Sequence, residues 1–345
     1  MHRLKCFELL RGHEVVRFRE PARDADELAE RLADAQGVVA IRERVAFPRS
    51  LLERLPKLEL LALVGRHSKV IDFAACKDLG IDVVQGSNAS PASPAELTLA
   101  LILASRRNIF TEAERMKRGD LPRALSHRLR GSTLGVLGLG TIGTLVAAAG
   151  AGMGMRILVS GREASLAKAK QAGHQAAKSK SQLFEESDVL TLQVRLTPDT
   201  RGSVTREDLA RMKPGALFVN TARAELVQPG ALLEALRNGR PGYVALDVYD
   251  EEPVPAGHPL LAMPNVLCTP HLGWAEYDNF ELYFGECFEQ IARYRRGEPP
   301  TTDRHPLEKK GRWRGPFSAR GDPSGFQRLL DTRRCDRHVL QPLGR

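Results

Sequence analysis

Ionisable side chains follow three apolar runs that are typical of β-strands. Arg223 comes after one run, Glu252 after the next along the chain, and His271 after the last. If these runs are strands of a doubly wound parallel sheet, the three side chains lie outside its carboxyl edge, where such sheets bind ligands. There an arginine fork can bind a carboxylate through two hydrogen bonds. A histidine can supply a proton near neutral pH, and a neighbouring carboxylate favours its protonated form. This set is what the reduction of a 2-keto acid would require.

Each of these residues also has a plainer interpretation. Arg223 could be a surface ion-pair partner, and His271 could be a turn residue, since it follows a proline. Glu252 could be a solvated loop residue, in which case Glu251 beside it is the alternative carboxylate. We expect Arg223, Glu252 and His271 to form the catalytic set.

A glycine-rich turn separates a buried strand at 133–138 from a helix at 141–152. Gly138 permits the tight turn, Gly140 lets the backbone approach a pyrophosphate, and Gly143 lets the helix pack against the strand. The helix N-terminus directs its free N–H groups towards the anion. The alternative is a glycine turn without a ligand. We expect a dinucleotide to be bound here by Gly138, Gly140, Thr141, Ile142 and Gly143.

The next strand ends in Ser160, Gly161 and Arg162, without the carboxylate that commonly holds the adenosine ribose at this place. Glu163 comes too late to stand at the tip. A small residue, a glycine and an arginine can accommodate a 2′-phosphate, so Ser160 and Arg162 favour NADPH over NADH. The alternative is that Arg162 is a solvated residue at the start of a helix.

Strand-like runs and helical spacings alternate along most of the chain, which predicts an α/β fold with parallel sheets covered by helices. The expected strands are residues 15–18, 38–41, 60–64, 81–84, 133–138, 155–160, 188–193, 216–220, 243–247 and 266–268. The expected helices are residues 25–34, 48–55, 71–78, 94–118, 141–152, 164–172, 181–186, 205–211, 229–238 and 276–296. The first half of 94–118 is apolar nearly all round, so we expect it to be buried.

Composition narrows the class of protein. The chain has 345 residues and a net charge of +9, but residues 299–345 hold 11 Lys+Arg and 5 Asp+Glu, which leaves +3 for the preceding 298 residues. A nucleic-acid partner is therefore not expected for the folded body. No apolar run approaches the roughly 18 residues of a membrane span, so a membrane is not expected either. Five scattered cysteines without metal-type spacing predict free thiols in a reducing cytoplasm and no metal site.

The motifs GLGTIG, NTAR, ALDVYDEEP, HPL and NVLCTPHLG, in this order, resemble the D-isomer-specific 2-hydroxyacid dehydrogenases over about residues 5–298. The resemblance implies that Arg223 binds the substrate carboxylate and keto oxygen. It implies that His271, paired with Glu252, is the acid and base while a hydride moves between substrate C2 and nicotinamide C4. It also implies NAD(P)H as the cofactor and a homodimer.

Further contacts follow from the same resemblance. Asp247 would contact the nicotinamide carboxamide, and Thr221, within NTAR, would lie beside the cofactor. The family binds the substrate carboxylate with backbone N–H groups of a stretch that corresponds here to Val64, Gly65 and Arg66. The sequence departs from the family pattern at Ala224, where glycine is usual, and at Ser68, where asparagine is common.

The resemblance implies two domains. A flavodoxin-like substrate domain at 1–95, completed by a returning helix at 273–298, accompanies a Rossmann domain at 96–272. The family opens with a strand that this chain lacks, because residues 2–6 already resemble the start of the first helix; we therefore expect a substrate domain of low stability. Residues 299–345 break any period with Pro and Gly and are expected to be a disordered basic tail.

The primary hypothesis is a cytoplasmic oxidoreductase that transfers a hydride between NAD(P)H and a small 2-keto or D-2-hydroxy acid. The alternative is a non-catalytic NAD(P)-binding interaction protein of the same fold. A third class, nucleic-acid binding through the basic tail, rests on charge alone.

Overall fold

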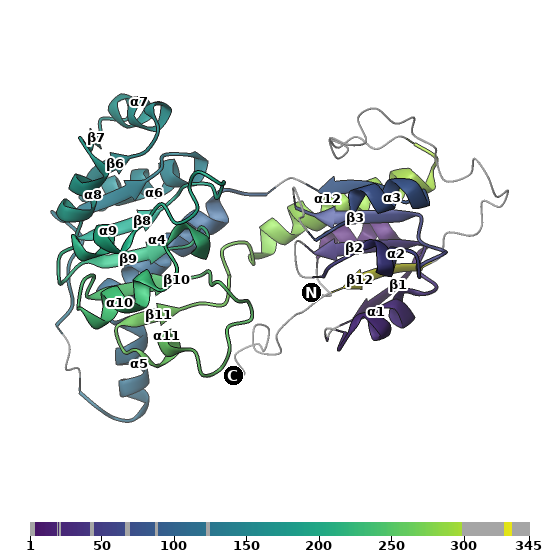
Figure 1. The fold of residues 1–345 in the computed structure, drawn as a ribbon, viewed down its shortest axis with the longest axis horizontal. Helices are drawn as coiled ribbons and strands as arrows, with labels where there is room; N and C mark the ends of the chain where they lie inside the picture. The colour runs from purple at the N-terminus through teal and green to yellow at the C-terminus, as the bar shows by residue number, and fades with distance from the viewer. Residues whose placement is uncertain are drawn as a thin grey trace. The chain divides into compact units, whose positions relative to one another are not determined.

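A computed structural model describes residues 4–18, 20, 22–41, 45–65, 70–86, 89–121, 125–298 and 328–332, the last of these by backbone alone. The chain divides into two compact units (Figure 1). Unit 1 comprises Met1–Ser90 with Tyr277–Arg345, and unit 2 comprises Pro91–Glu276. The chain therefore leaves unit 1 after Ser90 and returns to it at Tyr277, a few residues from the boundaries expected at 95 and 272.

Unit 1 is built on a parallel sheet with the strand order β1-β12-β2-β3-β4. Its strands are β1 (Glu14–Phe18), β2 (Gly37–Ile41), β3 (Leu60–Val64), β4 (Asp82–Gly86) and β12 (Arg328–Thr332). The other elements of unit 1 are η1 (Lys5–Leu10), α1 (Ala25–Leu32), α2 (Arg49–Leu52), α3 (Phe73–Leu79) and α12 (Tyr277–Arg295). β2 and β3 are buried along their whole length, as apolar strands covered on both faces should be.

Local signals begin and end the helices of unit 1. The carboxylate of Asp24 accepts a hydrogen bond from the N–H of Glu27 at 2.8 Å, which satisfies one free donor at the start of α1. α3 ends at Gly80, whose φ of +75° favours glycine. α12 packs against η1, where the rings of Phe7 and Phe288 lie 5.0 Å apart.

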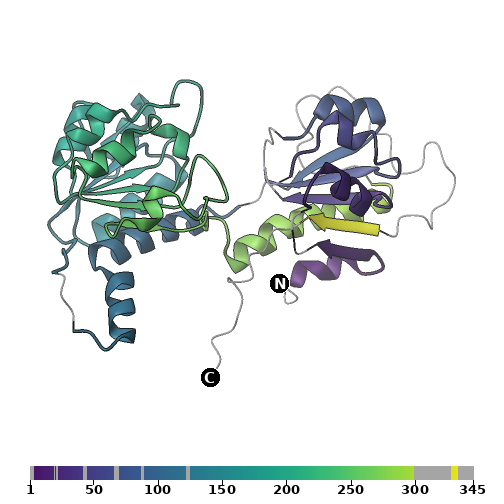
Figure 2. The same cartoon turned by 60° about the horizontal axis from the view of Figure 1, so that its bottom comes forward.

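β12 was not anticipated from the sequence (yellow in Figures 1 and 2). It pairs in parallel with β1 over five positions and with β2 over four, so it lies in the interior of the sheet. The expectation of disorder is therefore wrong for residues 328–332, and the rest of 299–345 lies outside the described residues. A segment near the C-terminus therefore supplies an interior strand of the sheet that was expected to lack one.

Unit 2 is built on a second parallel sheet, with the strand order β11-β10-β9-β8-β5-β6-β7. Its strands are β5 (Thr133–Leu137), β6 (Arg156–Ser160), β7 (Gln175–Ala176), β8 (Val189–Leu192), β9 (Leu217–Asn220), β10 (Tyr243–Leu246) and β11 (Val266–Cys268). Its helices are α4 (Ala92–Arg106), α5 (Ile109–Lys117), α6 (Thr141–Gly152), α7 (Glu163–Gln171), α8 (Lys180–Glu186), α9 (Arg206–Ala210), η2 (Ala224–Leu226), α10 (Ala231–Arg237) and α11 (Pro259–Ala262). The strand order reverses between β5 and β8, so this is a doubly wound Rossmann sheet and the expected α/β class is confirmed.

The helix expected at 94–118 is two helices. Asn108 has a φ of +51°, a left-handed conformation that asparagine tolerates, and it separates α4 from α5. The first half of 94–118 was expected to be buried all round, and within a single chain this expectation is wrong. α4 buries one face through residues such as Leu101 and Ile102, whereas Leu103 is 39% exposed. α5 stands away from the sheet in both views (Figures 1 and 2), and none of its nine described residues is buried.

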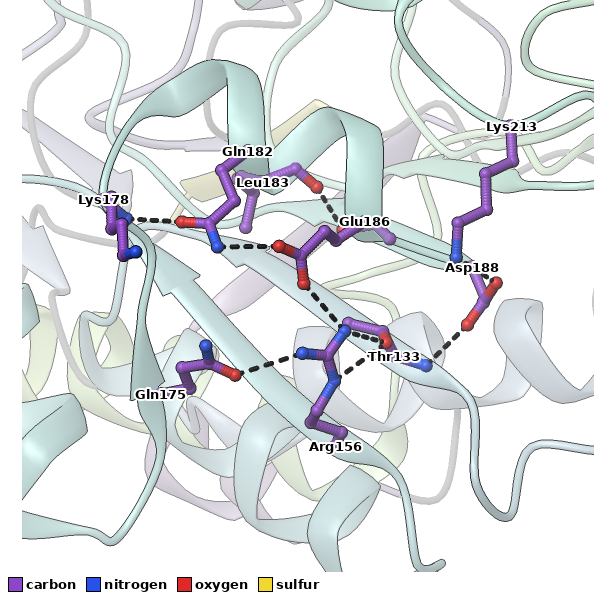
Figure 3. A network of polar contacts seen from close by, with 10 residues as sticks. Thr133, Arg156, Gln175, Lys178, Gln182, Leu183, Glu186, Asp188 and Lys213 are labelled. Carbon is purple, nitrogen blue, oxygen red and sulfur yellow. Dashed lines mark hydrogen bonds and ion pairs between the residues drawn. The ribbon is translucent and has the colours of Figure 1, made fainter.

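A polar network ties the strands together at the amino end of the unit 2 sheet (Figure 3). The carboxylate of Asp188 accepts from the N–H of Thr133 at 2.8 Å and from Lys213 Nζ at 2.7 Å. Arg156 Nη2 donates to Thr133 Oγ1 and to Glu186 Oε2, each at 2.9 Å. Because ligands bind at the opposite, carboxyl edge of such a sheet, this network serves the fold rather than the site.

The cysteines of the described residues are free thiols: Cys6, Cys76, Cys268 and Cys287. Cys335 lies outside the described residues. Among the helices that the structure describes, none combines the length and the apolar character that a bilayer span requires.

Candidate functional site

The glycine-rich turn joins β5 to α6 at the switch point of the unit 2 sheet. Gly138 has a φ of +94°, and a Cβ there would lie 2.6 Å from Val194 Cγ1. Gly143 is equally constrained, because its Cβ would collide with the carbonyl oxygen of Gly138. A Cβ on Gly140 would instead meet open space. Two of the glycines are therefore demanded by packing, and the middle one leaves room for a ligand.

The start of α6 fits an anion. Gly140 is the N-cap of this twelve-residue helix, and both Gly140 and Thr141 are exposed while Ile142 is half-buried. A helix N-terminus presents backbone N–H groups and the positive end of the helix dipole. With an unobstructed approach at Gly140, the residues of this turn fit the pyrophosphate of a dinucleotide.

The corner between β6 and α7 lies beside this turn. The carbonyl of Ser160, the last residue of β6, accepts a hydrogen bond from Gly138 N at 2.7 Å. Arg162 is exposed and is the N-cap of α7. Ser165, which the sequence analysis did not single out, accepts a hydrogen bond from Leu139 N at 3.3 Å and so links the corner to the turn. Its hydroxyl lies too far along a helix for the strand-end pattern to have identified it.

The expected acid–base pair is brought together at the carboxyl edge of the same sheet. His271 Nδ1 and Glu252 Oε2 are 2.7 Å apart, so the partner of the ring is Glu252 rather than Glu251. Burial acts to raise the pKa of Glu252, but the hydrogen bond and positive charge of His271 outweigh it. The N–H of Tyr249 and the charge of Arg223 act in the same direction, and the pKa of Glu252 lies below its ordinary value. Glu252 is therefore ionised at neutral pH.

Arg223 is exposed just past β9 on a turn that its own neighbours shape. The side chain of Asn220, the last residue of β9, accepts from Ala222 N at 3.0 Å and donates to the carbonyl of Arg223 at 2.9 Å. Asn220 was missed as a site residue, although a polar side chain that ends an apolar strand was a usable signal. Because the charge of Arg223 lowers the pKa of Glu252, the guanidinium lies within electrostatic reach of the acid–base pair.

Tyr249 is a third residue that was not expected from the sequence. Its N–H donates to Glu252 Oε1 at 3.1 Å, and its hydroxyl lies 3.0 Å from the carbonyl oxygen of Thr269 and 3.2 Å from that of Leu246. The phenol therefore bridges the ends of β10 and β11, while the backbone of the same residue orients Glu252. Burial raises the pKa of Tyr249, so the hydroxyl stays neutral.

Two of the expected cofactor contacts make hydrogen bonds within unit 2. The hydroxyls of Thr221 and Thr98 are 2.7 Å apart, which joins the end of β9 to α4. Asp247 is fully buried, and its carboxylate accepts hydrogen bonds from the loop that carries His271. Their contacts with a cofactor remain predictions.

The expected substrate contacts from unit 1 follow β3. Val64 ends this strand and is buried, and Gly65 follows it with a φ of +110°. The N–H of Gly65 donates to the carbonyl of Gly86 at 2.7 Å. Arg66 lies outside the described residues, as does Ser68.

Comparison with known proteins places this geometry in context. Residues 99–273 match the family model of the NAD-binding domain of D-isomer specific 2-hydroxyacid dehydrogenases. The chain is 38% identical to D-3-phosphoglycerate dehydrogenase of Methanocaldococcus jannaschii over 79% of its length, and the alignment spans 52% of that relative. It is 32% identical to glycerate dehydrogenase of Methylorubrum extorquens, with 79% of this chain and 87% of the relative aligned.

Comparison with solved structures points to the same kind of protein. The crystal structure of a putative D-3-phosphoglycerate dehydrogenase from Ralstonia solanacearum superposes with a TM-score of 0.82 at 44% identity, covering 87% of this chain and 92% of the other. A phosphoglycerate oxidoreductase from Vibrio cholerae superposes with a TM-score of 0.80 at 43% identity, covering 84% and 94%.

Proposed function

The chain belongs to the D-isomer specific 2-hydroxyacid dehydrogenases, and we propose that it reversibly reduces a small 2-keto acid to the D-2-hydroxy acid with NAD(P)H. The observation that carries the proposal is the 2.7 Å contact between His271 Nδ1 and Glu252 Oε2, within reach of the charge of Arg223. A proton donor, His271, and a cation, Arg223, at the carboxyl edge of one sheet suit a substrate that has a carboxylate beside a ketone.

Each side chain then has a separate task. The Arg223 guanidinium binds the substrate carboxylate and draws charge towards the keto oxygen. Because Glu252 holds Nδ1 of His271, the Nε2 atom is the ring nitrogen that gives its proton to that oxygen, and takes it back in the reverse direction. Bound NAD(P)H supplies the hydride that C2 of the substrate accepts. The N–H of Gly65, which was expected to bind the carboxylate after β3, is not free for this contact because it donates to the carbonyl of Gly86.

A panel of small 2-keto acids with both reduced cofactors tests the proposal. We expect turnover with at least one acid, and we expect His271→Ala to lower kcat by about 10²–10⁴-fold with little change in cofactor affinity, since the ring faces the substrate. Cofactor binding without turnover of any acid would instead support the alternative of a non-catalytic NAD(P)-binding protein. Equal losses of turnover and cofactor affinity in His271→Ala would make His271 a structural residue.

We also propose that NADPH is preferred over NADH. Arg162 is exposed at the N-cap of α7, two residues after β6, where its guanidinium can meet a 2′-phosphate. Calorimetry with both cofactors tests this preference. Arg162→Ala should weaken NADPH binding by roughly 1.5–3 kcal/mol, the range of a lost charge-assisted hydrogen bond, and should leave NADH nearly unaffected. Tighter binding of NADH by the unmodified chain would refute the preference.

We propose a homodimer formed through α4 and α5. Six of the twelve large hydrophobic side chains that are exposed in the described part of the chain lie between Leu103 and Leu125, including Phe110 and Met116. A helix such as α5, which buries none of its described residues, gains little from its own chain, so a partner surface is the natural cover. α5 also carries both signs of charge, which lets a second copy pair with it in an antiparallel arrangement.

Solution mass measures this proposal directly. We expect twice the 38.0 kDa of one chain for the unmodified protein and a shift towards 38.0 kDa for Phe110→Asp. Leu79→Asp, at a leucine of unit 1 that is 42% exposed against 57% for Phe110, is the control and should stay dimeric. A monomeric unmodified chain, or a control that dissociates as readily, would remove the basis for this interface.

A further inference from the structure

The loop that carries His271 is fastened to one buried carboxylate. Oδ1 of Asp247 accepts from Thr269 Oγ1 at 2.6 Å and from Leu272 N at 2.7 Å, and Oδ2 accepts from Gly273 N at 2.8 Å. The three donors lie on both sides of His271 in the sequence. The backbone of the loop therefore wraps around the carboxylate and holds His271 at its apex.

The backbone of His271 shows what this arrangement demands. Its φ is +55°, one of two positive values among the non-glycine residues that the structure describes. This left-handed region of backbone conformation is uncommon for residues with a Cβ, so the surrounding contacts must hold His271 in it. A left-handed residue directs the successive N–H groups of Leu272 and Gly273 to one side, and such a concave backbone is a binding site for an anion. Here the anion is the side chain of Asp247.

Burial restricts what else Asp247 can touch. Its exposed fraction is 0%, so in this conformation the carboxylate offers no surface to a ligand. Burial raises the pKa of Asp247 above its ordinary value, while the hydrogen bonds from the loop and the charge of His271 act in the opposite direction. The ring of His271 is thus oriented twice, through its backbone by Asp247 and through Nδ1 by Glu252 at 2.7 Å.

We propose that Asp247 is a positioning residue for catalysis, which holds the loop of residues 269–273 so that the ring of His271 meets both Glu252 and the substrate. The inference rests on the proposed function and is separate from the carboxamide contact that the family resemblance implies. A residue that acts through His271 lowers turnover only while His271 is present, whereas a cofactor contact changes cofactor affinity whether His271 is present or not.

Asp247→Asn is the main variant. It keeps the size of the side chain but presents an amide NH₂ to one of the three donors, so the loop loses at least one bond. We expect kcat to fall roughly 10- to 100-fold, which is the range that a misplacement of about 1 Å costs. The control is Asp250→Asn, at an exposed carboxylate three residues after Asp247, and it should leave kcat unchanged.

The double variant Asp247→Asn/His271→Ala separates the two roles. If Asp247 acts through His271, the double variant has the same kcat as His271→Ala alone. If Asp247 acts only on the cofactor, Asp247→Asn lowers kcat by the same factor in the His271→Ala background as in the unmodified chain, and our inference is then wrong.

A measurement that does not depend on turnover tests the inference even if the proposed activity is absent. The imidazole nitrogen signals of His271, assigned by comparison with His271→Ala, should shift in Asp247→Asn and in Thr269→Val, which removes only the 2.6 Å bond. They should be unchanged in Asp250→Asn. If the unmodified chain turns over no keto acid, the proposed function fails while this spectrum still decides whether Asp247 positions the ring. Unshifted signals in both variants would overturn the inference.

Discussion

Truncation after Glu298 removes β12 from the interior of the unit 1 sheet. We expect this change to unfold or strongly destabilise unit 1 while leaving unit 2 folded, because β12 belongs to unit 1 alone. Truncation after Thr332 is the matched control, since it removes the residues that follow the strand and keeps the strand itself. Leu330→Pro is a point variant for the same test, because proline donates no hydrogen bond to a ladder.

The size of the effect follows from the pairing. Four positions of β2, a strand that is buried along its whole length, lose their partner, as do five positions of β1. If only two buried groups of β2 stay unsatisfied, at about 1–3 kcal/mol each, the loss is roughly 2–6 kcal/mol. A typical domain is stable by about 5–15 kcal/mol in total, so this loss is a large part of it.

Hydrogen–deuterium exchange read by mass spectrometry measures the two units separately. Peptides that contain β2 should lose protection in the chain ending at Glu298 and in Leu330→Pro, and should keep it in the chain ending at Thr332. Peptides that contain β5 should be equally protected in all of them. Undiminished protection of β2 after removal of β12 would show that the strand contributes nothing to the sheet, and the reasoning from its register would be refuted.

Three further predictions concern unit 2. Gly140→Ala should weaken cofactor binding without lowering the melting temperature, because a Cβ at Gly140 meets open space. Gly143→Ala should also destabilise unit 2 by roughly 1–3 kcal/mol, because a Cβ at Gly143 collides with the carbonyl oxygen of Gly138. Equal melting temperatures of the two variants would contradict this difference. Glu252→Gln should make reductase activity fade at a lower pH than in the unmodified chain, because the carboxylate that favours the protonated ring is gone; an unshifted rate profile over pH 5–9 would argue against the pair. Burial acts to raise the pKa of Asp188, but Lys213 and a backbone N–H outweigh it, so the pKa of Asp188 lies below its ordinary value. The ionised carboxylate therefore stabilises the fold above about pH 4, and this stabilisation is lost as the pH falls through the lowered pKa. Asp188→Asn should accordingly cost up to about 1 kcal/mol in urea unfolding at pH 7 and progressively less below pH 4, and a difference that does not depend on pH would count against this ion pair.

Apart from β7, which was not predicted, the strands of the unit 2 sheet could be predicted well because most of their residues are apolar and several end in chemically distinctive residues. Runs such as 216–220 and 243–247 leave few alternatives to a buried strand, and Arg223 and Glu252 follow these two runs in the sequence. The break at Asn108 could not be predicted, since the residues on both sides have helical spacing and one left-handed residue leaves no periodic signal.

The supporting contacts of the site were harder to predict than its reactive groups. Tyr249 and Asp247 act through backbone atoms of residues about twenty positions away, and such contacts depend on how two loops meet in space. β12 was missed for a different reason: five residues with a charge at each of two positions, surrounded by Pro and Gly, do not resemble a central strand. Its assignment to the sheet depends on a gap between β1 and β2 that only the tertiary structure reveals.

The place of β12 has a consequence for synthesis on the ribosome. β2 ends at Ile41, and β12 begins at Arg328. At translation rates of about 5–20 residues per second, the roughly 290 residues between them take about 15–60 s to be made. Unit 2 is complete before β12 emerges, because it ends at Glu276. During this interval the edges of β1 and β2 await their partner, and nascent unit 1 is the part of the chain that a chaperone would have to shield from neighbouring polypeptides.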